Sequence, residues 1–162
     1  MNAPLLLSPA ALANIDKAIA KYPPDQKQSA VMAALTIAQD ENGWLSAATM
    51  DFVAQYLAMP PIAVYEVASF YAMYDLTPAG KCKLAICTNL PCALQGATIA
   101  AEHLKKTLGV EFGETTADRA FTLREAECMG ACGDAPVRLV NNKRMVCAMT
   151  PDKLDQLIEE FK

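Results

Sequence analysis

The sequence predicts an α+β protein in which a small helical bundle is followed by a small α/β domain. Apolar residues recur at helical spacing through the first half of the chain and alternate with polar residues, as in strands, after Gly80. The composition changes at Thr77-Pro78-Ala79-Gly80, so the predicted domains are 1–77 and 78–162. With 162 residues, 53% of them hydrophobic, the chain is long enough to build two small cores.

The first two helices are predicted from their end signals. One begins at Ser8-Pro9, where a serine N-cap precedes a proline in the first turn, and it ends at Pro23-Pro24. The second is expected from near Asp25 to Asn42, because Gly43 is suited to a C-terminal cap.

Two more helices complete the predicted bundle. The third begins at Ser46 and carries apolar residues at Met50, Val53 and Leu57. Pro60-Pro61 ends it and opens the fourth, whose apolar residues are Ile62, Val64, Tyr65, Val67 and Ala68. Four short helices with brief connections are typical of a small bundle.

The second half is predicted to have the order β-α-β-β-β-α, a small α/β sandwich. Alternation over residues 81–86 predicts a strand that ends at Cys87, and a helix is expected over Gly96–Leu108. The other predicted elements are a strand at Ala120–Glu125, a hairpin of Val137–Val140 and Lys143–Ala148 turning at Asn141-Asn142, and a last helix opened by Thr150-Pro151.

Charge and hydropathy exclude several functions. The net charge is −4, with three basic and seven acidic residues up to Leu76 and eleven of each after it, so a nucleic-acid interface is not expected. The longest strongly apolar stretch, 30–38, is far shorter than the roughly 20 residues that cross a bilayer. No basic residue precedes Lys17, so the positive start of a secretory signal is missing and we expect a cytoplasmic protein.

Two cysteine pairs indicate a metal centre. Cys87 and Cys92 enclose four residues, Cys128 and Cys132 enclose three, and 35 residues separate the pairs. Each pair is predicted to lie in a loop after a strand, where two such loops can supply four sulfurs, the ligand count of a [2Fe-2S] cluster. Small residues around Cys132 would let backbone N–H groups approach the inorganic sulfides.

Other interpretations stay open at this point. A zinc site with four cysteine ligands has the same count, although zinc ribbons usually space their cysteines two residues apart. A thiol redox enzyme would normally show Cys-x-x-Cys, and the lone His103 is interpreted as a partly exposed surface residue. Cys82 and Cys147 are both expected at strand positions as small buried hydrophobic residues.

The motifs resemble a known family. Cys-Thr-Asn-Leu-Pro-Cys at 87–92 and Glu-Cys-Met-Gly-Ala-Cys-Gly-Asp-Ala-Pro at 127–136 are similar to the thioredoxin-like [2Fe-2S] subunits of NADH:quinone oxidoreductase, respiratory complex I. The resemblance extends into the helical half through the segments beginning at Asp25, Gly43 and Val64. It therefore covers nearly the whole chain.

The resemblance implies a fold, a cofactor and a partner. It implies a thioredoxin-like ferredoxin domain after the helical one, with Cys87, Cys92, Cys128 and Cys132 as ligands of a [2Fe-2S] cluster. It also implies docking on a subunit that binds flavin mononucleotide and NADH, and one-electron exchange with that flavin. The complex would hold the chain at the cytoplasmic face of the inner membrane, or on the matrix side in a mitochondrion.

Activity of the isolated chain is not expected, because no Gly-rich dinucleotide loop follows a strand. Similar subunits of NAD-dependent formate dehydrogenases and NAD-reducing hydrogenases are the alternative, and a zinc-stabilised interaction module is another. We further expect the first domain to supply most of the partner contact, because it carries the aromatic run Tyr65, Phe70, Tyr71 and Tyr74.

Overall fold

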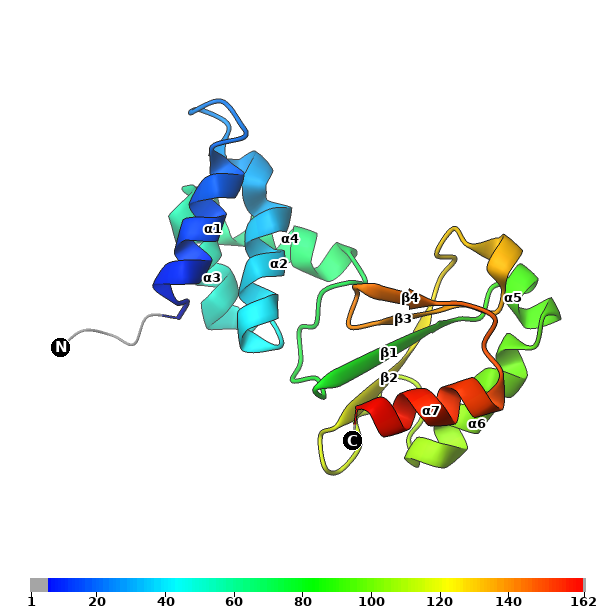
Figure 1. Cartoon of the computed structure of the whole chain (residues 1–162). Coiled ribbons are helices and arrows are strands. Elements are labelled where there is room, and N and C mark those ends of the chain that lie inside the picture. The colour runs from blue at the N-terminus through cyan, green and yellow to red at the C-terminus, as the bar shows by residue number, and fades with distance from the viewer. Residues whose placement is uncertain (1–5, 162) are drawn as a thin grey trace. The chain divides into compact units, whose positions relative to one another are not determined.

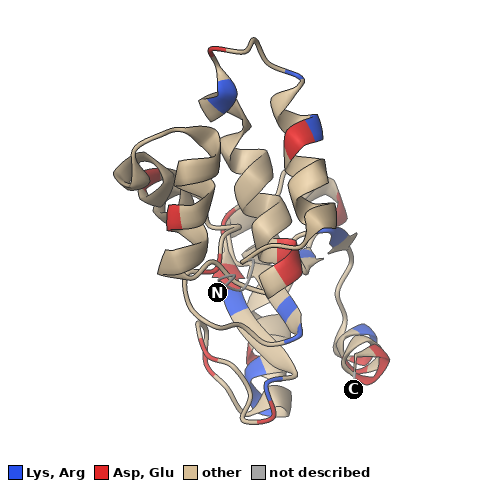
Figure 2. Cartoon of the chain, turned by 90° about the vertical axis from the view of Figure 1, so that its left-hand side faces the viewer, with Lys and Arg blue, Asp and Glu red and all other residues tan. Residues whose placement is uncertain are grey.

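The computed structural model describes residues 6–161, and the chain divides into two compact units between Pro78 and Ala79 (Figure 1). The first unit contains helices and the second contains a mixed sheet with helices, so the α+β prediction is confirmed. In the part of the chain described, no helix is long and apolar enough to cross a membrane. Lys and Arg residues lie scattered among Asp and Glu residues (Figure 2).

Helix α1, Pro9–Ile19, begins where the sequence predicts. The Ser8 hydroxyl accepts a hydrogen bond from the Ala11 amide at 3.2 Å, so serine is the N-cap and proline occupies the first turn. The Ser8 amide and hydroxyl also donate to the Glu41 carboxylate, at 2.6 and 2.8 Å. These bonds connect the start of α1 to the end of the next helix.

The second predicted helix starts later than expected. A short 3₁₀ turn, η1 (Lys27–Ala30), precedes α2 (Val31–Asn42). The predicted start at Asp25 is wrong because its carboxylate accepts a bond from the Gln26 side chain instead of capping backbone amides. Gly43, at φ 79°, is the C-terminal cap that the sequence predicts.

Helices α3 (Ala47–Leu57) and α4 (Pro61–Phe70) complete the first unit. The Ser46 hydroxyl caps α3 by accepting from the Thr49 amide at 3.1 Å. The core of this unit is formed by apolar side chains from α1 to α4, among them Ile15, Leu35, Val53, Leu57 and Val64.

The second unit is built on a four-stranded sheet of order β2-β1-β3-β4. Its strands are β1 (Cys82–Cys87), β2 (Phe121–Ala126), β3 (Arg138–Val140) and β4 (Arg144–Val146). β1 and β2 are parallel, and the other pairs are antiparallel. The hairpin turns where predicted, with Asn141 and Asn142 at φ 52° and 57°.

The helices of the second unit are α5 (Leu90–Leu94), α6 (Ala97–Leu108) and α7 (Pro151–Glu160). The sequence analysis missed α5, which is too short for a periodic pattern. Figure 1 shows α6 and α7 on one face of the sheet. Leu84, Ile86, Leu104, Leu123 and Leu154 belong to the core between them.

Arg138 is an unusual member of this interior. It is opposite Ile86 in the sheet and is fully buried. Its guanidinium nitrogens have no hydrogen-bond partner among the described residues. Burial lowers the pKa of Arg138 to about 10, because a charge is costly away from water.

Candidate metal centre

The first cysteine pair lies at the carboxyl end of β1. Cys87 is the last residue of the strand, and the short helix α5 returns the chain so that Cys92 also points inward. Both side chains are 1% exposed. The Cys87 amide donates to the carbonyl of Val137 at 3.1 Å, which fixes the end of β1 against the segment leading into β3.

The second pair lies in the loop after β2. Cys128 and Cys132 are exposed, and their sulfur atoms are 3.5 Å apart. The Gly130 amide donates to the Cys128 sulfur at 3.4 Å. Gly130 has φ 76°, a region that side chains disfavour, so glycine permits this turn around the sulfur.

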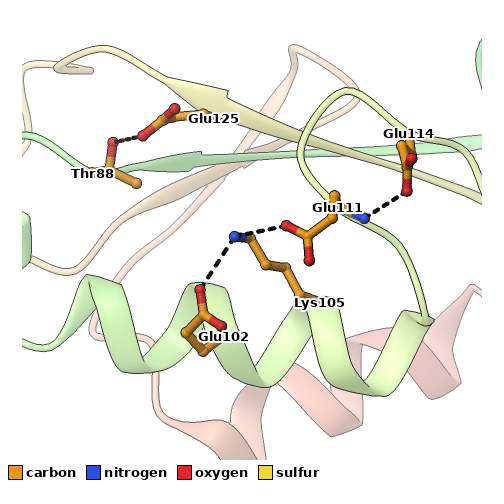
Figure 3. A network of polar contacts seen from close by, with 6 residues as sticks. All are labelled: Thr88, Glu102, Lys105, Glu111, Glu114 and Glu125. Carbon is orange, nitrogen blue, oxygen red and sulfur yellow. Dashed lines mark hydrogen bonds and ion pairs between the residues drawn. The ribbon is translucent and has the colours of Figure 1, made fainter.

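Parallel pairing brings the two loops together. Cys87 is opposite Ala126, so both cysteine segments leave the sheet at neighbouring strand ends. The Thr88 hydroxyl donates to the Glu125 carboxylate at 2.7 Å (Figure 3), and the Asn89 side chain donates to Glu127 at 2.8 Å. These bonds hold the first cysteine loop beside the second.

A small apolar cluster surrounds the buried pair. Cys87 and Cys92 pack with Ala97 and Val137, and residues from the second loop pack against this group: Met129, Ala131 and Ala135. The structure therefore places all four predicted residues at one end of the sheet, two of them buried and two exposed.

The thiols differ in their readiness to ionise. The pKa of Cys128 is lowered by the hydrogen bond from Gly130 and then by that from Cys132, whereas the pKa of Cys132 is raised by its bond to Cys128. Burial raises the pKa of Cys87, although the amide of Asn89 acts in the opposite direction. Thiolate, the form that binds metal, therefore forms most readily at Cys128 in the exposed loop.

The donor set fits an iron–sulfur cluster better than a single ion. All four thiols are free, and a Cβ placed on Gly130 or Gly133 would meet no atom within 4 Å, which leaves room beside the sulfurs. Within residues 6–161, no three His, Cys, Asp or Glu side chains converge on a position for one metal ion. A structural zinc needs four ligands on one centre, whereas a [2Fe-2S] cluster divides its cysteine ligands between two irons.

The remaining cysteines lie in different places. Cys82 is buried in the core between sheet and helices, as predicted, and burial raises its pKa to about 11. Cys147 follows β4 instead of lying within it, so its predicted strand position is wrong. It is half-buried and packs against the cluster of Cys87 and Cys92, a proximity that its spacing in the sequence did not reveal.

His103 and the aromatic run contribute to internal contacts. His103 on α6 lies 2.6 Å from the Asp155 carboxylate on α7, so it connects two helices. The Tyr74 hydroxyl donates to the Met32 carbonyl at 2.9 Å and is buried in the first unit. Phe70 and Tyr71 are exposed and form an edge-to-face pair. A partner contact through the first domain stays a prediction.

Fold and site together define a class of protein: a small α+β protein whose mixed sheet carries four thiols in two pairs at one end. The family model described as thioredoxin-like [2Fe-2S] ferredoxin matches residues 15–162, and the chain belongs to this family. The cofactor of the family is a [2Fe-2S] cluster, as its description states.

Curated relatives match most of the chain. It is 43% identical over 148 residues to the E subunit of NADH-quinone oxidoreductase from Rickettsia conorii, covering 91% of this chain and 88% of that protein. It is 41% identical over 150 residues to the mitochondrial NADH dehydrogenase (ubiquinone) flavoprotein 2 of Dictyostelium discoideum, covering 90% of this chain and 61% of that protein.

A solved structure supports the fold. The crystal structure of an NAD⁺-reducing [NiFe]-hydrogenase in the air-oxidized state matches with a TM-score of 0.72 at 23% identity. The match covers 86% of this chain and 24% of the hydrogenase chain. It therefore includes both units of the fold.

Proposed function

We propose that this chain is the electron-transfer subunit of an NADH:quinone oxidoreductase, with its [2Fe-2S] cluster held by Cys87, Cys92, Cys128 and Cys132. The observation that carries the proposal is the placement of two cysteine pairs at the ends of neighbouring parallel strands. The parent complex is supported by the relatives from Rickettsia, which are 42–43% identical and are named as parts of NADH-quinone oxidoreductase.

The residues of the site would hold the cofactor asymmetrically. The cluster, when bound, supplies reversible one-electron exchange. Cys87 and Cys92 lie buried under α5, whereas Cys128 and Cys132 are on an exposed loop, so the chain would shield one half of the centre and leave the other near the surface. The bonds of Thr88 and Asn89 to the second loop would keep the two halves in a constant position.

The flavin and NADH would belong to a partner. A chain whose task is to hold a cluster needs no general acid or base, so we place flavin mononucleotide and the NADH site on the adjacent subunit. The isolated chain would then not oxidise NADH. In the assembled complex the chain would lie peripherally, at the cytoplasmic face of the membrane or on the matrix side.

Electron paramagnetic resonance of the anaerobically purified chain, before and after reduction with dithionite, tests the cofactor. We expect a signal that appears on reduction, together with two irons and two labile sulfides per chain. A silent spectrum in both states with about one zinc per chain, the count of a mononuclear site, would instead establish a zinc-stabilised module.

The parent enzyme is tested by isolating a tagged chain from its native cells. We expect it to bring down a flavoprotein with NADH:quinone oxidoreductase activity. Recovery of formate dehydrogenase or hydrogenase activity would move the chain to one of those complexes while leaving the cluster assignment intact.

A further inference from the structure

Three large apolar side chains are exposed just after the first cysteine pair. Leu90, Leu94 and Ile99 are 70%, 75% and 69% exposed, and we call them the α5 patch. Among residues 6–161, five large apolar side chains are at least 68% exposed, and three of them fall in this ten-residue stretch. Single exposed apolar residues are ordinary, but such a concentration beside a cofactor site marks an interaction surface.

The α5 patch is tied to the site through the backbone of α5. Leu90 and Leu94 are four residues apart on this helix, so their side chains are neighbours on one face. Cys92, between them, is buried on the other face. The helix that positions one sulfur therefore presents two leucines outward, and Figure 1 shows α5 at the end of the sheet that carries the cysteines.

The surroundings of the α5 patch are acidic. The sequence has no Lys or Arg over residues 84–104 or 125–137, the segments that carry the four cysteines. The exposed charges of the second segment are Glu125, Glu127 and Asp134. An apolar centre with an acidic edge is complementary to a protein surface with an apolar centre and a basic edge.

We infer that the α5 patch, with Glu125, Glu127 and Asp134 at its edge, is the face that docks on the flavin-bearing subunit, whose contacting surface is apolar with Lys or Arg around it. The inference rests on the proposed function, because it takes that subunit as the partner. It places the contact beside the exposed cysteines, where an electron has the shortest path between the two proteins.

The acidic edge disfavours the other occupants of such a face. A second copy of this chain, paired by two-fold symmetry, would bring the same carboxylates toward one another. The cytoplasmic surface of a membrane is itself negative and would repel them. A basic protein surface gains attraction where these two incur repulsion.

Titration calorimetry with the purified, flavin-loaded partner subunit tests the docking face. The full-length, cluster-loaded chain is compared with its Leu90→Ser and Leu94→Ser variants, after resonance spectra have verified an intact cluster. We expect each substitution to raise Kd about tenfold or more, as for a central contact. Met145→Ser is the matched control, because Met145 is an exposed apolar residue of the same unit, on β4.

Glu127→Gln tests the acidic edge in the same assay. The amide can still accept the hydrogen bond from Asn89, so the loop is preserved while one charge is lost. We expect a slower association and a weaker dependence of its rate on salt.

The outcomes separate the docking face from the proposed function. Tight binding by the wild type with unchanged Kd in both leucine variants would overturn the docking face and leave the function standing. An equal loss in the Met145 control would also overturn the face. A wild-type chain that carries its cluster but does not bind the flavin-bearing subunit would overturn both.

Discussion

The sulfur atoms of Cys128 and Cys132 lie 3.5 Å apart, and the amide of Gly130 between them donates to the first. This pair faces solvent, whereas the pair on β1 and α5 is buried. The two halves of the proposed centre therefore differ in access although they supply the same kind of ligand. That difference makes the exposed pair suitable for a ligand test, because a change there disturbs no core packing.

Replacing Cys128 or Cys132 by serine is expected to prevent stable cluster binding. Loss of an outer partner of a ligand already costs about tenfold or more in metal affinity, and loss of a ligand should cost at least as much. Iron and sulfide content per chain is the measurement. Cys147→Ser is the control, since Cys147 packs nearby but is not in either pair. Equal loss of iron in that control would require Cys147 to be a ligand.

Cys82 should make the folded chain less stable in alkali. Its ordinary pKa of 9.0 is raised to about 11 by burial, so above pH 9.0 the unfolded chain loses this proton while the folded chain keeps it. Stability is thus lost as the pH rises between these values, by at most about 3 kcal/mol. Urea unfolding of wild type and Cys82→Ala at pH 8 and 10.5 measures the difference. Parallel declines in the two proteins would show that Cys82 does not contribute.

Gln39→Leu should destabilise the first unit. The Gln39 side chain is buried, donates to the Met73 carbonyl at 2.9 Å and accepts from the Asp75 amide at 2.6 Å. Leucine would remove both bonds and leave buried backbone groups without these partners, at a cost of about 2 kcal/mol or more. Urea unfolding is the measurement, with Gln55→Leu on the exposed side of α3 as control. Equal stability of the two variants would contradict the role of Gln39.

Arg138→Met should stabilise the second unit. The guanidinium is fully buried, and its nitrogens lack hydrogen-bond partners among the described residues. A methionine of similar length avoids the cost of burying the charge, so we expect a gain of about 1–3 kcal/mol. Arg144→Met is the control; Arg144 pairs with Glu160 at 2.6 Å on the surface, and its loss should change stability by less than about 1 kcal/mol. A clear loss of stability in Arg138→Met would show that the charge is needed.

The two proposed domains, 1–77 and 78–162, should fold separately. The core of the first unit and the two apolar clusters of the second have no residue in common. We therefore expect a chain of residues 78–162 to unfold cooperatively and to take up two irons, as measured by denaturation and iron analysis. A fragment that stays unfolded, or that takes up iron only when residues 1–77 are added, would contradict this division.

Local signals in the sequence determined the ends of most elements. Ser8, Ser46 and Gly43 cap helices where predicted, because capping depends on a side chain and the few backbone groups beside it. The strand that ends at Cys87 and the turn at Asn141-Asn142 also follow from short-range alternation and turn preference. Asp25 failed as a start signal because a neighbouring side chain took its carboxylate.

The cysteine spacing, likewise, identified the two pairs before any fold was known. Ligand type and count are chemical properties of the residues, so sequence alone could point to a four-sulfur centre. The family match over residues 15–162 agrees with that interpretation.

Tertiary structure decided the properties that depend on contacts distant in sequence. The strand order β2-β1-β3-β4 arises from packing of the whole sheet, and it places the second cysteine loop beside the first. Burial of Cys87 with exposure of Cys128, the enclosed charge of Arg138, and the internal position of Tyr74 beside exposed Phe70 have the same origin. No local pattern encodes them, because the burial of a side chain is determined by whichever elements cover it after the chain has folded.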